Sequence, residues 1–149
     1  MLQFRRAIAQ EVPLIHQLLT EMAEGALQAS PESLHQHGFG AEPRFRVVLA
    51  EAEAPLGFCL FLPEYSSWRG EMGVFVQDIY LRPTARGLGA GRGLLAAAWD
   101  EAQDWQPGFM ALMVKDSNHP AIGFYKSLGF ALRDQASPYL LEGAALDAL

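Results

Sequence analysis

The amino-acid sequence predicts an α/β fold in which one domain, residues 1–149, builds a mixed sheet with helices on both sides. Three observations support this prediction. A chain of 149 residues suits a single domain that buries about two-thirds of its unfolded surface. Apolar residues recur at every second position in some segments and at every third or fourth position in others, as strands and helices require. These segments alternate along the chain without an internal repeat, a low-complexity tract or a linker.

The expected strands are apolar or alternating runs bounded by turn residues. They lie at residues 2–8, 45–50, 56–62, 72–81, 109–114 and 130–133, and a closing strand and helix occupy residues 139–149. Because five of the six residues in 109–114 are apolar, we expect this strand to be buried on both faces. Residues 65–70 read as a polar-aromatic loop.

The expected helices have apolar residues three and four positions apart. This spacing covers residues 12–22, and it returns after the strand at 72–81 and continues up to Pro107. Ser30 is a typical N-cap for a short second helix that ends near residues 38–40. Asn118 is an N-cap candidate for a last long helix, and Gly129 provides its left-handed stop.

The most informative segment is the turn after the strand at residues 72–81. A helix starts inside this turn, which contains Arg86 and four alternating glycines: Gly87, Gly89, Gly91 and Gly93. Without side chains, several consecutive backbone N–H groups can point at one anion, with the positive end of a helix dipole behind them. The turn therefore predicts a pyrophosphate site, against the alternative of a glycine-rich surface loop.

The glycine spacing selects among phosphate-binding motifs. No register of these glycines gives the G-x-G-x-x-G of a dinucleotide fold, and no Gly-Lys-Ser/Thr of a P-loop follows. Arg86-x-x-Gly89-x-Gly91 resembles the R/Q-x-x-G-x-G/A element of the GCN5-related N-acetyltransferases (GNAT), which hold acetyl-coenzyme A. About thirty residues later, the run from Asn118 to Phe130 resembles the same family's N-x-x-A-x-x-F-Y-x-x-x-G-F motif.

A narrower resemblance links the chain to the diamine (spermidine/spermine) and thialysine acetyltransferases. It is carried by residues 55–58, 63–70 and 77–80, which are similar to the G-F-A, Y-S-T-W-x-G and E-D-L-Y segments of those enzymes. The chain departs from them at Gln77, which replaces a glutamate, and at Ser117, which replaces a tryptophan. The tail also lacks their Glu-x-Trp.

The resemblance implies a mostly antiparallel sheet of about seven strands, and direct transfer of an acetyl group from acetyl-CoA to the primary amine of a small molecule such as a diamine, polyamine or thialysine. It also implies a homodimer. The expected substrate contacts are Tyr65, Trp68, Gln77 and Asp78. The expected cofactor contacts are Ile79, Tyr80, Leu81, Arg86, Gly87, Leu88, Gly89, Ala90, Gly91, Arg92, Asn118, Tyr125 and Lys126.

Acetyl transfer needs two proton movements. An alkyl-ammonium with a pKa near 10.4 must lose a proton before it can attack, and Asp78 is the candidate acceptor, directly or through water. The leaving thiolate needs a proton, which the resemblance assigns to Tyr125. Asp78 could instead be structural at a strand bulge, and Tyr125 could be a core aromatic. Tyr65 and Trp68 suit a loop anchor or a dimer contact as well as a substrate wall.

Composition excludes several other classes. A net charge of −6 argues against nucleic-acid binding and weakly suits a cationic substrate. The single cysteine, Cys59, excludes an internal disulfide and reads as a buried, inert thiol. No metal site is expected, because His35 and His37 point to different helix faces and no acidic or thiol ligands accompany them. With no membrane span or signal peptide in the sequence, we expect a cytoplasmic protein.

Two other functions stay open at this point. A protein or peptide N-acetyltransferase would keep the fold and present an open acceptor groove. A non-catalytic acyl-CoA-binding module would bind the cofactor without transferring its acyl group.

Overall fold

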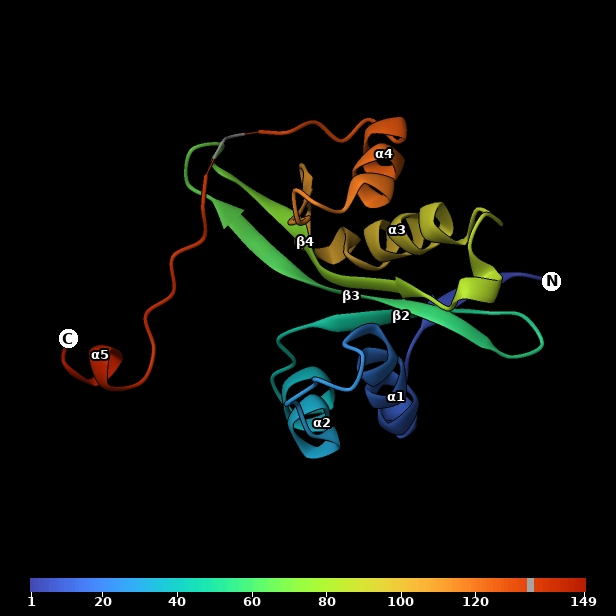
Figure 1. Cartoon of the computed structure of the whole chain (residues 1–149), viewed down its shortest axis with the longest axis horizontal. Helices are drawn as coiled ribbons and strands as arrows, with labels where there is room; N and C mark the ends of the chain where they lie inside the picture. Colours follow the sequence, from blue (N-terminus) through green and yellow to red (C-terminus); the bar gives the residue numbers. More distant parts are fainter. Residues whose placement is uncertain (134–135) are drawn as a thin grey trace. The chain divides into compact units, whose positions relative to one another are not determined.

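A five-stranded sheet in the order β1-β2-β3-β4-β5 is the framework of residues 1–113. In the computed structural model, which describes residues 1–133 and 136–149, β1 to β4 are antiparallel neighbours and β5 runs parallel to β4 (Figure 1). The strands are β1 (Gln3–Arg6), β2 (Arg46–Glu51), β3 (Pro55–Ser66), β4 (Glu71–Leu81) and β5 (Met110–Leu112).

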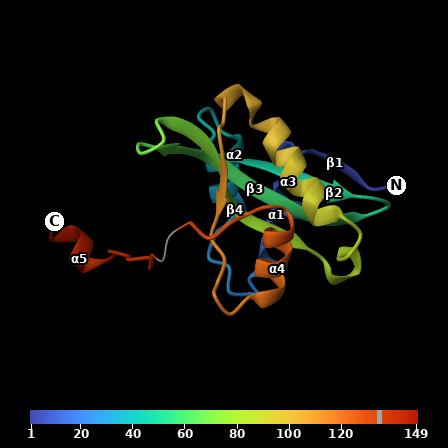
Figure 2. The same cartoon turned by 90° about the horizontal axis from the view of Figure 1, so that it is seen from above.

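Helices cover both faces of this sheet, as the sequence predicts. On one face lie α1 (Val12–Met22), preceded by the 3-10 turn η1 (Ala9–Glu11), and α2 (Pro31–Phe39). Their buried residues form one core with Val47, Leu49, Phe58 and Leu60 of the sheet. Helix α3 (Ala90–Glu101) crosses the strands on the opposite face, as Figure 2 shows, between the 3-10 turns η2 (Pro83–Ala85) and η3 (Gln103–Trp105).

Side chains alternate between the two faces of the sheet along β2 and β3, and buried residues lie on both faces. Leu49 and Phe58 face α1 and α2, whereas Val48 and Cys59 point to the other side, and all four are buried. Cys59 is completely buried, and this burial raises the pKa of its thiol. Both findings confirm the expectation of an inert thiol.

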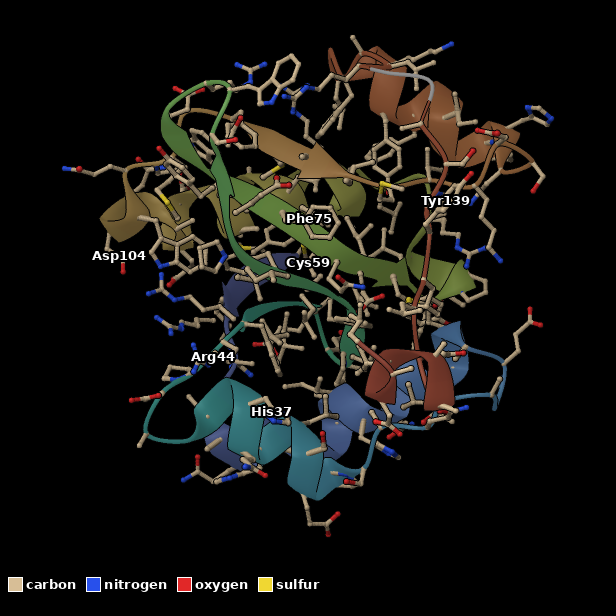
Figure 3. All side chains as sticks on the ribbon, turned by 90° about the vertical axis from the view of Figure 1, so that its left-hand side faces the viewer. His37, Arg44, Cys59, Phe75, Asp104 and Tyr139 are labelled. Atoms are coloured by element: carbon tan, nitrogen blue, oxygen red, sulfur yellow. The ribbon has the colours of Figure 1, made fainter. Side chains whose placement is uncertain are left out.

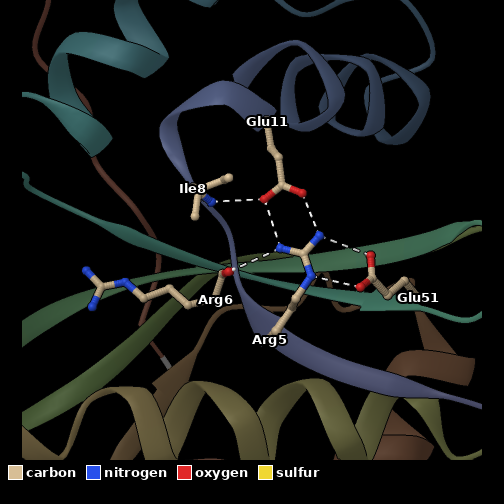
Figure 4. Close-up of polar contacts among 5 residues, drawn as sticks. All are labelled: Arg5, Arg6, Ile8, Glu11 and Glu51. Atoms are coloured by element: carbon tan, nitrogen blue, oxygen red, sulfur yellow. Dashed lines mark hydrogen bonds and ion pairs between the residues drawn. The ribbon is translucent and has the colours of Figure 1, made fainter.

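A cluster of charges ties the start of the chain to the sheet. The Arg5 guanidinium of β1 donates through Nε to Glu51 of β2 at 2.8 Å and through Nη1 to Glu11 of η1 at 3.0 Å (Figure 4). Glu11 also accepts the Ile8 N–H at 2.9 Å. The hydrogen bond from Arg5 holds the pKa of Glu11 below its usual range. One partly buried cation therefore connects three segments that approach each other only in the folded chain.

Residues 114–149 form a second compact unit. It contains α4 (His119–Ser127) and the short α5 (Ala144–Asp147). The Asn118 side chain accepts the Ala121 N–H at 3.4 Å, and Gly129 has a φ of +101°, so the predicted cap and stop of α4 are confirmed.

The prediction of about seven strands is wrong, because the described residues contain five. Residues 130–133 and the segment from Tyr139 adopt no strand. A strand needs a neighbour for its backbone groups, and an apolar run in the sequence does not supply one. Tyr139 and Leu140 are instead 98% and 81% exposed.

The expectation that residues 109–114 form a strand buried on both faces is also wrong. β5 covers only Met110–Leu112, and all three residues are half-buried. Because β5 pairs with β4 alone and ends the sheet in the described part of the chain, one of its edges has no neighbouring strand. The loop expected at residues 65–70 is shorter as well, since β3 continues to Ser66.

Candidate active site

A bulge in β4 shapes the first part of the site. Phe61 of β3 pairs with Val76, and the preceding Leu60 pairs with Asp78, so Gln77 is an extra residue on β4. Such a bulge bends the strand and redirects its side chains. Asp78 pairs with Leu60 and therefore lies on the same face of the sheet as Leu60, the face against which α1 and α2 pack. Gln77 is exposed.

Asp78 has the environment of a general base. Its side chain is half-buried, and this burial raises the pKa of the carboxyl above its usual value. A raised pKa makes the carboxylate a stronger proton acceptor. The bulge beside it also fits the structural alternative, a carboxylate at an irregularity of the strand.

Beyond the bulge, one edge of β4 has no neighbouring strand among the described residues. β5 pairs only with Val74, Phe75 and Val76, so the stretch 77–81 is paired on the β3 side alone. The Arg82 N–H donates to the Leu56 carbonyl at 2.8 Å, which fixes the alternation of the ladder. Ile79 and Leu81 therefore turn their backbone groups to the open edge, and Tyr80 turns its groups to β3.

We expected Ile79, Tyr80 and Leu81 to hold the cofactor through their backbone groups. Ile79 and Leu81 face the edge where an extended ligand can add as a strand, but this expectation is wrong for Tyr80, whose backbone groups face β3. The Leu81 carbonyl accepts a hydrogen bond from Arg86 Nε at 3.1 Å, so Arg86 closes over the end of β4. The Tyr80 side chain points to α1, where its hydroxyl donates a hydrogen bond to Glu21 at 3.4 Å.

The glycine turn has the conformation of an anion site. Gly87 and Gly89 have φ values of +80° and +78°, the left-handed region that favours glycine. A Cβ built at either position meets no atom within 4 Å, so both face open space. Among the described residues, no backbone or side-chain acceptor is bonded to the N–H groups from Gly87 to Arg92, and the ladder resumes with Gly93 N–H to Gly89 O at 3.1 Å.

The remaining residues of the turn divide into two kinds. Gly93 serves packing, since a Cβ there would overlap the ring of Phe4 in β1. Leu88 and Arg92 are exposed, Ala90 is buried at the start of α3, and Gly91 is half-buried beside it. The structure therefore keeps the amides and one cation open to a ligand at the helix N-terminus.

The predicted residues of α4 lie in the second unit. Tyr125 is half-buried, with its ring centroid 5.4 Å from that of Phe124 and 5.6 Å from that of Phe130. Lys126 is exposed, and the Asn118 amide caps the helix. The ring of Tyr125 therefore has a fixed support within its own unit.

Tyr65 and Trp68 lie apart from Asp78. Tyr65 pairs with Met72, five residues before Gln77 on β4, which corresponds to about 16 Å along the strand. Trp68 occupies the turn between β3 and β4 and is 95% exposed. Within one chain, the structure does not bring these aromatic residues next to the bulge.

Sequence reasoning missed a charged network beside Tyr80. Arg82 donates to Glu21 of α1 at 2.8 and 3.0 Å and to the Pro55 carbonyl at 2.9 Å. These hydrogen bonds keep the pKa of Glu21 below its usual value. The partners lie 61 positions apart in the sequence, and neither belongs to a motif, so no local pattern could have linked them.

The described residues contain no group of three or more metal-ligating side chains. None of the described helices has the length and apolar character needed to cross a membrane.

Residues 12–130 match the family described as Acetyltransferase (GNAT) family, and the chain belongs to that family. It is 32% identical over 129 residues to the thialysine N-epsilon-acetyltransferase of Bos taurus, covering 77% of this chain and 75% of that protein. It is 34% identical over 93 residues to the L-ornithine N5-acetyltransferase NATA1 of Arabidopsis thaliana, covering 62% of this chain and 41% of that protein.

Among solved structures, AAC(6')-Iy in complex with a CoA bisubstrate analog has the same fold. The TM-score is 0.84 at 16% identity, over 96% of this chain and 99% of that chain. The predicted family and enzyme class are confirmed: the chain is an N-acetyltransferase that uses acetyl-CoA as its acyl donor.

Proposed function

We propose that this enzyme acetylates the primary amine of a small cationic molecule, of the diamine, polyamine or thialysine type, by direct transfer. One observation carries the proposal: the open edge of β4 runs from the Asp78 bulge to the glycine turn. Relatives named for thialysine and ornithine acetylation support the small-molecule acceptor. Homodimerisation stays a prediction from the resemblance, and a cytoplasmic location stays a prediction from the sequence.

The residues present fit acetyl-CoA. The Ile79 and Leu81 backbone groups would hold its pantetheine arm, and the amides from Gly87 to Arg92 its pyrophosphate, in the space that a Cβ at Gly89 would enter. Acetyl-CoA supplies the acetyl group as a thioester, whose C–S bond breaks while the amide C–N bond forms.

The chain's own groups handle the two protons. Asp78 accepts one from the substrate ammonium, which at pH 7.4 is neutral in only about one molecule in a thousand. Tyr125 donates its hydroxyl proton to the departing sulfur. As the amide forms, its nitrogen loses a second proton, which restores the Tyr125 hydroxyl, and Asp78 returns its proton to solvent. The net products are the amide, the free thiol and one proton.

The proposal is tested with acetyl-CoA and a panel of polyamines, lysine analogues, aminoalcohols and lysine-containing peptides. We expect turnover of small amines. Turnover of peptides alone would identify a protein acetyltransferase, and tight acetyl-CoA binding without turnover of any acceptor would identify a binding module. Either result would overturn the proposed function.

Asp78→Asn is expected to lower kcat/KM at neutral pH by about 10- to 100-fold, because the amide cannot accept the proton. The same change is expected to raise the melting temperature. Since burial raises the pKa of Asp78, its ionised form costs stability at any pH above its usual pKa, and asparagine removes that cost. An unchanged kcat/KM would leave Asp78 with the structural role alone.

A further inference from the structure

Glu64 of β3 carries an unusual oxygen. Among the residues that the structure describes, its Oε2 is the one buried side-chain oxygen or nitrogen without a hydrogen-bond partner. A carboxylate oxygen that is buried without a hydrogen-bond partner destabilises the fold. Such oxygens are rare in folded proteins and need a specific explanation. A bound cation would supply the missing partner.

Glu64 shares its sheet face with Asp78. Side chains at every second position of β3 point the same way, so Leu60, Leu62 and Glu64 lie on one face. Asp78 pairs with Leu60 and Phe75 pairs with Leu62, which places both on that face as well. Phe75 is half-buried and is labelled in Figure 3. The face therefore presents an acid, an apolar pair and a second acid in line.

The spacing of the two acids defines a class of ligand. Glu64 lies four positions after Leu60, which corresponds to about 13 Å along the strand. The position opposite Glu64 is Gly73, whose missing side chain leaves room that the Phe109 ring occupies. A flexible acceptor with an ammonium at each end and an apolar chain between matches this arrangement.

We propose that Glu64 is a specificity residue that binds the second, non-reacting cation of the acceptor, while the amine to be acetylated lies at Asp78. This inference rests on the proposed function. The methylene chain of the acceptor crosses Phe75, and the distal ammonium donates to Glu64 Oε2. The nitrogens of such an acceptor lie roughly 11 Å apart, or about nine bonds in an extended chain.

The test compares 1,8-diaminooctane with 8-aminooctan-1-ol, which replaces one ammonium by a hydroxyl. We expect the wild-type enzyme to show a KM for the diamine at least about 10-fold lower, beyond the factor of two from its two equivalent ends. Glu64→Gln is expected to raise the diamine KM by about 10- to 100-fold, the loss of one charge-assisted hydrogen bond. It should leave kcat and the aminoalcohol KM unchanged.

Glu71→Gln is the matched control. Glu71 pairs with Ser66 on the same sheet face and loses the same charge, but its carboxylate already contacts Arg69 at 3.4 Å. If Glu71→Gln reproduces the effect, or if Glu64→Gln shifts both substrates equally or neither, the role of Glu64 is overturned while the proposed function stands. If the wild-type enzyme turns over no amine at all, the proposed function fails and this inference with it.

Discussion

Gly89→Val is expected to weaken acetyl-CoA binding by at least about 100-fold, or roughly 2.7 kcal/mol. Gly89 stands at the N-cap of α3 with a φ of +78°, and a Cβ there projects into open space. A branched side chain fills the room in which the pyrophosphate would approach the amides, and one or two charge-assisted hydrogen bonds are lost. Titration calorimetry of the purified variant with CoA measures the change.

Gly70→Val is the matched control for this experiment. Gly70 lies in the turn between β3 and β4 with a φ of +66°, and a Cβ built there also meets nothing within 4 Å. Both substitutions therefore impose similar backbone strain, at positions in different turns. We expect Gly70→Val to lower the melting temperature as Gly89→Val does, yet to keep wild-type CoA affinity. If both variants bound CoA with wild-type affinity, the pyrophosphate would not bind at the glycine turn.

The glycine turn was predictable because its information is local. A positive φ, an exposed helix N-terminus and the absence of side chains are all properties of consecutive residues, and the structure has each of them at Gly87 and Gly89. Gly93 belongs to the same pattern, but its neighbour Phe4 is remote in sequence. The motif alone could not show that this glycine serves packing.

Features that depend on contacts between distant residues could not be predicted, because the sequence does not show which segments meet. The bulge at Gln77 arises from the register between β3 and β4, and no residue type in this segment indicates it. The unpartnered oxygen of Glu64 depends on what the folded sheet places around it. The two strands wrongly expected after α4 had suitable residues, but the sequence could not show whether another strand would pair with them.

Tyr125→Phe is expected to lower kcat by about 100-fold or more, with little change in CoA affinity. The substitution removes only the hydroxyl and keeps the ring, which packs between Phe124 and Phe130 at centroid distances of 5.4 and 5.6 Å. The helix and the packing of the ring therefore persist, and the fall in kcat measures the contribution of the hydroxyl proton that the departing sulfur requires. Steady-state kinetics with the best acceptor of the panel, together with calorimetry, separate kcat from binding.

Tyr139→Phe controls for the loss of a phenol from the same unit, since Tyr139 is 98% exposed. We expect this variant to retain wild-type kcat. An unaltered kcat in Tyr125→Phe would refute the acid role and leave the tyrosine as an aromatic support for α4.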